Sequence, residues 1–162
     1  MVVHSAQTGE RSALLDIALK TRLFTPDEAE ALLGGTLDGL ADGSLPETHQ
    51  SVVCRAPAGE ALGWSYFAPD AYAEDVWNIW WLGVAPEHHG QGVAQALLSH
   101  IEQTITQLGG RVIVIETSDQ QPLARARRFY AKSGYSECGR IPDFYGAGDA
   151  KVILARSMTK VG

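Results

Sequence analysis

Hydrophobic residues along this chain fall into two kinds of pattern, one with the spacing of strands and one with the spacing of helices. Short apolar or alternating runs predict strands in MVVHSA, HQSVVCR, EALGWSYFA, DVWNIWWLGV, RVIVIETS, YSECGRI and DAKVILARSM. Helical spacing occurs in GERSALLDIALKTRLF, TPDEAEALLGGTLDGLADG, residues 91–108 and QPLARARRFYAKSG. The resulting order, β-α-α-β-β-β-α-β-α-β-β, predicts an α/β fold built on a mixed sheet.

Several local signals set the predicted boundaries. Thr25, Pro26 and Glu28 form a capping box with proline at the first helical position. Gly34 and Gly35 are expected to weaken or interrupt that helix. The turn APAG predicts a hairpin between the second and third strands, and PDFYGAGD is interpreted as a loop between the two closing strands.

Composition and charge narrow the class of protein. The 162 residues are 45% hydrophobic and 20% charged, which indicates one globular domain over residues 1–162. The net charge of −6 argues against a protein that coats nucleic acid. No apolar run is long enough to cross a bilayer and no secretory signal is seen, so we expect a cytoplasmic protein without a membrane partner. Cys54 and Cys138 have no metal-ligand spacing, and no metal is expected.

The stretch EHHGQGVAQALL places two glycines where a strand gives way to a helix. A helix N-terminus presents unpaired N–H groups and a partial positive charge, and small residues let an anion approach them. The same residues could also form an ordinary strand-to-helix turn. A phosphate-binding loop of the GxxxxGK[ST] type and a GxGxxG dinucleotide turn are both absent here, which disfavours a nucleotide-binding domain.

Three segments in order give this chain a resemblance to the GNAT superfamily of acyl-CoA-dependent N-acetyltransferases. They are WNIWWLGVAP leading into HGQGVA, then GGRVIVIETS, then ARRFYAKSGY, and the best match covers residues 76–137. The resemblance implies a mostly antiparallel central sheet with helices on both faces. It also implies acetyl-CoA as co-substrate, and a small amine or a peptide or protein amine as acceptor.

The resemblance assigns roles to particular residues. Backbone N–H groups around Gln91 to Ala94 would bind the pyrophosphate, and Leu82 to Val84 would pair with the pantetheine arm. The expected cofactor-binding residues are Leu82, Val84, His89, Gly90, Gln91, Gly92, Val93 and Ala94. Tyr130 would protonate the departing thiolate, although an aromatic side chain at this position could also simply fill the core.

Two positions depart from the family pattern. His89 stands where the family prefers Arg or Gln, and Asn78 stands where some members carry a glutamate base. Glu116 is the first candidate for the base, because a carboxylate on a buried strand is a better proton acceptor, although it could equally cap a helix. Asp143 and Tyr145 come next, and Asp75 is the third choice. The candidate acceptor-binding residues are Asn78, Trp80, Asp143 and Tyr145, with two of Trp77, Trp80 and Trp81 expected in the core.

The predicted function is therefore acetyl transfer to a primary amine by direct attack. The alternative is a catalytically silent CoA-binding sensor or interaction module of the same fold, which the residues at positions 78 and 89 keep open. The closing strands would also suit a homodimer.

Overall fold

The computed structural model describes residues 1–158, which fall into two compact units. The first unit contains Met1–Ala68 and Trp81–Ile105, and the second contains Pro69–Trp80 and the chain from Thr106 onward. Seven strands form one mostly antiparallel sheet in the order β1-β2-β3-β4-β5-β7-β6. Their bounds are β1 Val2–Ser5, β2 Gln50–Arg55, β3 Ala61–Pro69, β4 Val76–Val84, β5 Val112–Ser118, β6 Ser136–Gly146 and β7 Asp149–Ser157. The predicted α/β class and mixed sheet are confirmed.

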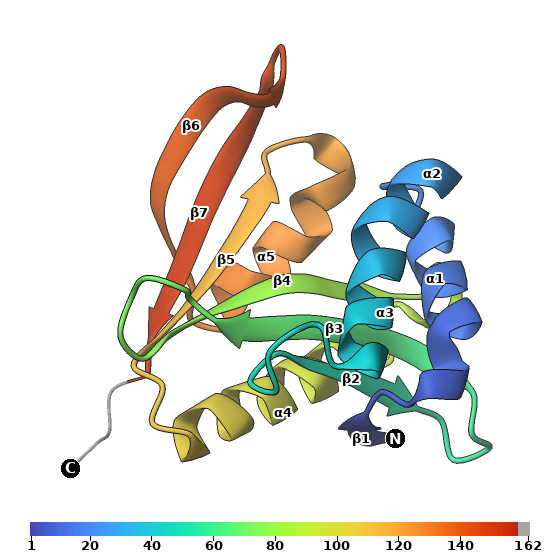
Figure 1. Ribbon diagram of the computed structural model, residues 1–162. Coiled ribbons are helices and arrows are strands. Elements are labelled where there is room, and N and C mark those ends of the chain that lie inside the picture. Colours follow the sequence, from blue (N-terminus) through green and yellow to red (C-terminus); the bar gives the residue numbers. More distant parts are fainter. Residues whose placement is uncertain (159–162) are drawn as a thin grey trace. The chain divides into compact units, whose positions relative to one another are not determined.

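The first unit is an antiparallel sheet with helices on both faces (Figure 1). Strand β2 pairs with β1 from Arg55↔Val2 to Val52↔Ser5, and with β3 from Gln50↔Phe67 onward. Helices α1 (Arg11–Lys20) and α3 (Gly35–Asp42) lie over one face, and α4 (Val93–Gln107) lies over the other. The core beneath α1 and α3 joins residues of these helices to the strands: Leu14, Leu15, Ile17, Ala18, Leu33, Leu37, Val53, Trp64, Trp81 and Ala85.

The predicted second helix is continuous through its glycines. Helix α2 (Pro26–Ala29) begins at the capping box, in which Thr25 Oγ1 accepts from the Glu28 N–H at 3.2 Å. It continues through a π-helical turn, Glu30–Gly34, into α3. A Cβ on Gly34 would lie 2.7 Å from an Arg11 guanidinium nitrogen. The glycine thus makes room for a packed side chain, and the expected interruption appears only as a widened turn.

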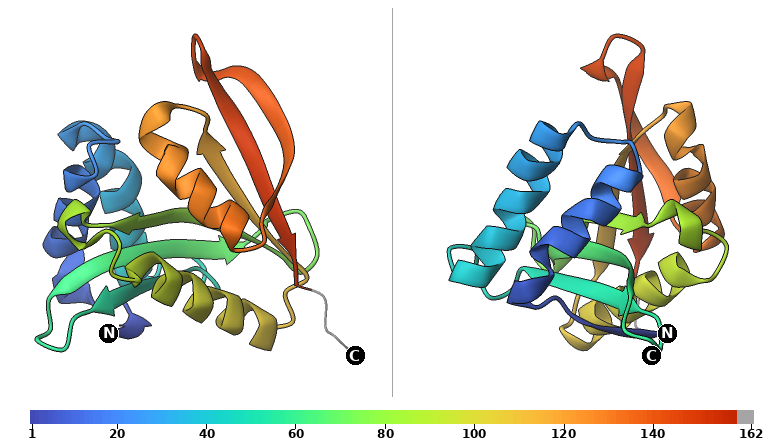
Figure 2. Two further views of the ribbon diagram at one scale, coloured as in Figure 1. Left: turned by 180° about the vertical axis from the view of Figure 1, so that it is seen from behind. Right: turned by 90° about the vertical axis from the view of Figure 1, so that its right-hand side faces the viewer.

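The second unit continues the sheet from the first half of β4. Strand β5 pairs in parallel with β4 from Val112↔Val76 to Ile115↔Ile79, and antiparallel with β7. Strand β7 pairs with β6, and α5 (Ala124–Lys132) connects β5 to β6 (Figure 2).

One predicted boundary in this unit is wrong. The segment PDFYG was interpreted as a loop, but it is the last part of β6, and only the turn between Gly146 and Asp149 interrupts the hairpin. The pairing shifts between Ile141 and Gly146, so an irregular stretch of strand replaces the expected loop.

Among residues 1–158, no helix is both long and apolar enough to span a membrane. In the same range, no three His, Cys, Asp or Glu side chains are grouped so that they could hold a metal ion.

Candidate functional site

In the first unit, the glycine turn adopts the backbone that its sequence predicts. Gly90 and Gly92 have φ values of 79° and 82°, in the left-handed region that other residues rarely enter. Both are exposed, as are His89 and Gln91. Helix α4 begins at Val93, two residues after the predicted start, so Gln91 and Gly92 belong to the turn.

The first turn of α4 directs its N–H groups toward this exposed loop. The first helical hydrogen bond runs from the Ala96 N–H to the Gly92 carbonyl at 3.0 Å. The N–H groups of the residues before it therefore have no partner within the helix. The side chain of Val93 is buried and that of Ala94 is half-buried, so both anchor the turn to the core. Small residues, left-handed glycines and open N–H groups together fit a diphosphate.

Side chains beside the turn hold its shape. His88 lies 3.3 Å from Gln91 Oε1 and 3.3 Å from Glu60 Oε1, so its ring is engaged with the loop. Glu87 pairs with Lys20 on α1 at 2.9 Å, and this contact lowers the pKa of the Glu87 carboxyl. His89, which the resemblance assigned to cofactor binding, is exposed.

The end of β4 that precedes the turn is packed tightly. Val84 is buried and Leu82 is half-buried. The Trp81 ring covers Gly83, which lies between these two residues. A Cβ at position 83 would be 2.1 Å from that ring. The Trp81 carbonyl accepts from the Ser65 hydroxyl at 2.5 Å, and the Ala85 N–H donates to the Leu62 carbonyl at 2.9 Å.

In the second unit, Tyr130 on α5 is buried, with 6% of its surface exposed. Its ring lies 5.3 Å from that of Phe129 and 5.9 Å, edge-on, from that of Tyr135. Burial raises the pKa of the Tyr130 phenol well above its ordinary value. The phenol therefore keeps its proton at physiological pH, as a proton donor must.

Glu116 does not stand alone on its strand. Its Oε2 lies 2.9 Å from the Lys151 ammonium of β7, and the two side chains are 30% and 13% exposed. The ammonium also lies 3.7 Å from the centroid of the Phe144 ring and 5.9 Å from that of Tyr145. Glu116 is thus half of an ion pair beside two aromatic rings, an arrangement that the sequence did not predict.

Asn78 is buried, and its amide is oriented by a carboxylate. Its Nδ2 donates to Asp70 Oδ2 at 3.0 Å, and this bond is the main reason that the pKa of Asp70 is lowered. Trp77 and Trp81 are buried, whereas Trp80 is 50% exposed. The expectation that two of the three tryptophans are core residues is confirmed, and Trp80 offers a free aromatic surface.

The predicted acceptor residues of the β6–β7 hairpin differ from each other. Asp143 has a φ of 57°, and its Oδ1 accepts from the Gly148 N–H at 2.8 Å across the hairpin turn. Its carboxylate therefore fixes the turn. Tyr145 is 49% exposed and contacts Phe144 edge-on at 5.0 Å. Burial raises the pKa of the Tyr145 phenol, and the nearby Lys151 opposes this rise.

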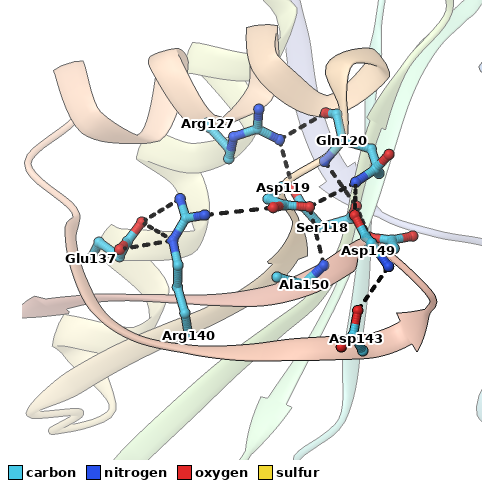
Figure 3. A network of polar contacts seen from close by, with 10 residues as sticks. Ser118, Asp119, Gln120, Arg127, Glu137, Arg140, Asp143, Asp149 and Ala150 are labelled. Carbon is cyan, nitrogen blue, oxygen red and sulfur yellow. Dashed lines mark hydrogen bonds and ion pairs between the residues drawn. The ribbon is translucent and has the colours of Figure 1, made fainter.

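A polar network ties this hairpin to the start of α5 (Figure 3). Arg127 donates to the carbonyls of Ser118 and Gln120 at 2.6 and 2.9 Å, so it is a structural residue. Arg140 reaches Asp119 at 3.5 Å, and Asp119 accepts from the Ala150 N–H at 3.1 Å. The network fixes the end of β5, where Glu116 lies.

Three residues beside the predicted ones were not anticipated: Asp70, Phe144 and Lys151. Asp70 Oδ1 accepts from the N–H groups of Tyr72 and Ala73 at 2.9 and 3.1 Å. These bonds form an Asx-type turn within the segment APDAYAE. Lys151 is the charged residue that begins the segment KVIL, but its partner is 35 residues away in sequence. Only the strand register could identify that pair.

Comparison with known proteins gives a family match. Residues 21–135 match the model of the acetyltransferase (GNAT) family. A GNAT-family protein from Desulfovibrio desulfuricans has 24% identity and a TM-score of 0.87, with 98% of this chain and 99% of that chain covered. No curated protein matches the sequence.

Two further solved structures share the fold. An aminoglycoside 6′-N-acetyltransferase complexed with coenzyme A has 16% identity and a TM-score of 0.81, over 100% of this chain and 99% of that chain. The ribosomal-protein-S18-alanine N-acetyltransferase from Escherichia coli has 18% identity and a TM-score of 0.76, over 99% and 96%. At these identities the likeness establishes the fold.

Proposed function

Because this chain belongs to the acetyltransferase (GNAT) family, we propose that it transfers an acetyl group from acetyl-CoA to a primary amine. The observation that carries the proposal is the pair of left-handed glycines, Gly90 and Gly92, before the open N-terminus of a 15-residue helix. Such a turn presents N–H donors to a diphosphate without a basic side chain. Bound acetyl-CoA would supply a thioester-activated acetyl group.

The residues of the turn would hold the cofactor. The N–H groups of Gln91, Gly92, Val93 and Ala94 would donate to the pyrophosphate, and Leu82 to Val84 would bind the pantetheine amides through the backbone. His89 is exposed and free to add one hydrogen bond. Since backbone N–H groups make most of these contacts, loss of the His89 side chain should weaken binding without abolishing it.

Tyr130 would hold the proton that the leaving thiolate takes up. Its burial keeps the phenol protonated, and proton donation by a positioned side chain contributes about 10²–10⁴-fold to rates. Glu116 is the first candidate to accept the proton of the incoming ammonium, with Lys151 setting its orientation. No cysteine is placed as a nucleophile by sequence, which supports direct attack by the amine.

The acceptor would meet exposed aromatic surface and polar groups of the second unit. Trp80 and Tyr145 are about half exposed, at 50% and 49%. Asn78 is fixed by Asp70 and could hydrogen-bond an acceptor through its amide. Two structural relatives are named for an aminoglycoside and for a ribosomal-protein alanine, so both small-molecule and protein amines fall in the proposed class. The net charge of −6 favours a cationic acceptor.

The same proposal extends to location and assembly. We place the protein in the cytoplasm, without nucleic acid or membrane as a partner, and we regard a homodimer through the closing strands as compatible with activity. The assignments of location and of excluded partners rest on the acidic charge and the lack of a long apolar run in the sequence.

Release of free thiol from acetyl-CoA in the presence of a panel of amines tests this function. The panel should contain aminoglycosides, simple alkylamines and peptides with free N-termini. We expect amine-dependent thiol release with at least one class. Tight CoA binding without thiol release would favour the catalytically silent sensor, which the ion-paired state of Glu116 and the Asn at position 78 keep in view.

A further inference from the structure

The side chain of His88 connects the glycine turn to a second loop of the first unit. His88 ends a short 3₁₀ turn, where its N–H donates to the Ala85 carbonyl at 2.8 Å. Its Nδ1 lies 3.3 Å from Gln91 Oε1, and its Nε2 lies 3.3 Å from Glu60 Oε1. Glu60 belongs to the turn between β2 and β3, and the His88 side chain is 18% exposed. The ring is therefore held between two loops, one of which is the proposed diphosphate site.

Both atoms that face the ring of His88 are hydrogen-bond acceptors. The oxygen of Glu60 belongs to a carboxylate, which only accepts. The amide of Gln91 is oriented by a bond of its own, because its Nε2 donates to the Glu87 carbonyl at 3.4 Å and its Oε1 then faces His88. A neutral imidazole has one N–H and can serve one of these two partners, whereas the imidazolium donates from both nitrogens. Both contacts are thus made together only by the doubly protonated ring.

The charges beside the turn are also balanced only with a protonated ring. Glu87 pairs with Lys20 of α1 at 2.9 Å, so this carboxylate has a counter-charge. The ion-pair partner of Glu60 is His88. With a neutral ring, Glu60 would keep no counter-charge in the described part of the chain, and its negative charge would oppose an anionic ligand. The neighbouring His89 is the other titratable side chain at this turn, and it is exposed.

We propose that doubly protonated His88 is a positioning residue for the cofactor-binding turn, so that the turn binds a diphosphate more tightly at low pH. The imidazolium holds Gln91 in place, which fixes the N–H groups at the start of the turn, and it neutralises Glu60. Loss of one ring proton removes one of the two contacts and leaves a negative charge near the ligand. This inference rests on the proposed function, because it concerns how the same turn holds its ligand.

Calorimetric titration with dephospho-coenzyme A at about pH 6 and about pH 8, the range in which histidine changes its charge, tests this role. This compound keeps the diphosphate and the pantetheine arm but lacks the 3′-phosphate, so its own charge stays constant over that range. We expect the wild type to bind about threefold more weakly at the higher pH, the scale of one exposed ion pair. His88→Gln should bind with one affinity at both pH values, close to that of the wild type at the higher pH.

Three further variants separate charge from packing. His88→Arg carries a permanent cation with N–H groups on a planar head, so it should bind at the higher pH as tightly as the wild type does at the lower pH. Glu60→Gln should bind more tightly than the wild type at the higher pH, because it leaves no unbalanced negative charge. His100→Gln, on α4, is the control and should keep the full pH dependence.

Four results would overturn the role of His88. They are a wild-type affinity that does not change with pH, a pH dependence that survives in His88→Gln, one that disappears in His89→Gln instead, and absence of binding by millimolar dephospho-coenzyme A. The first three would leave the acetyltransferase assignment standing. After the fourth, thiol release from acetyl-CoA in the presence of amines would show whether the proposed function fails as well.

Discussion

The ammonium group of Lys151 on β7 lies 2.9 Å from the carboxylate of Glu116 on the neighbouring strand β5. Lys151 is only 13% exposed and also contacts the Phe144 ring, so the pair is held in place from two sides. The contact therefore gives the Glu116 carboxylate a fixed orientation.

The first prediction concerns Glu116 as the proton acceptor. Glu116→Gln should lower kcat/KM about 10²-fold and remove the acidic limb of its pH profile. Lys151→Met should also lower kcat/KM, because the carboxylate loses the ammonium group that orients it. Lys151→Arg, which retains the charge, serves as the control. A pH profile of Glu116→Gln with the wild-type acidic limb would exclude this residue as the base.

Tyr130 gives the second prediction. Tyr130→Phe should lower kcat about 10²-fold with little change in KM, because only the proton donor is lost. Since burial raises the pKa of this phenol, no loss of activity from its ionisation is expected below about pH 10. Tyr135→Phe, which removes the hydroxyl of the neighbouring ring, is the control. If Tyr130→Phe retained wild-type kcat, the phenol would be a packing residue only.

The third prediction follows from the half-buried imidazole of His49. Burial lowers its pKa in the folded state, so the unfolded chain binds a proton more readily. Stability should therefore fall as the pH drops through about 6.5, the unperturbed pKa of histidine, and be fully present above it. Urea unfolding at several pH values should show that the unfolding free energy declines less with falling pH in His49→Gln than in the wild type. An equal decline in both proteins would remove His49 as the cause, and His100→Gln controls for loss of a histidine elsewhere.

Two glycines of the first unit should respond to alanine with opposite signs. In Gly83→Ala the added methyl group meets the Trp81 ring at 2.1 Å, so we expect a loss of about 1–3 kcal/mol of unfolding free energy from overpacking. Gly35→Ala adds a methyl group in open space within a helix and should stabilise by about 0.5–1 kcal/mol. Denaturant unfolding compares the two. Equal tolerance at both positions would show that the Trp81 ring can move aside.

The sequence predicted the features of this fold that depend on neighbouring residues. The capping box at Thr25, the hairpin turn between β2 and β3, and the strand-to-helix turn at Gly90 and Gly92 are all local, and all were found. The buried strand from Val76 to Val84 was clear from its continuous apolar run. Local rules succeeded there because the preferences of those residues agree with their tertiary surroundings.

Features that depend on strand register were missed. The segment PDFYG has turn composition, yet pairing with β7 makes it part of β6, since tertiary context outweighs intrinsic preference. The contact of Glu116 with Lys151 joins residues 35 positions apart and follows only from the β5–β7 register.

The glycine turn allows a direct test with a matched control. Gly92 and Gly43 have similar φ values of 82° and 77°, so alanine imposes the same backbone strain at either position. An added methyl group at Gly92 meets only Met1 at 3.6 Å, an ordinary contact, and at Gly43 it meets nothing within 4 Å. The two variants should therefore lose similar amounts of unfolding free energy. They should differ only in that Gly92→Ala obstructs a ligand at the start of α4.

Calorimetric titration of coenzyme A into the wild type and these two variants is the most direct measurement of ligand binding at this turn. We expect the wild type to bind, Gly92→Ala to bind at least about tenfold more weakly, and Gly43→Ala to bind like the wild type. Absence of binding to the wild type at millimolar coenzyme A, or equal affinity for Gly92→Ala, would contradict a diphosphate site at the start of α4.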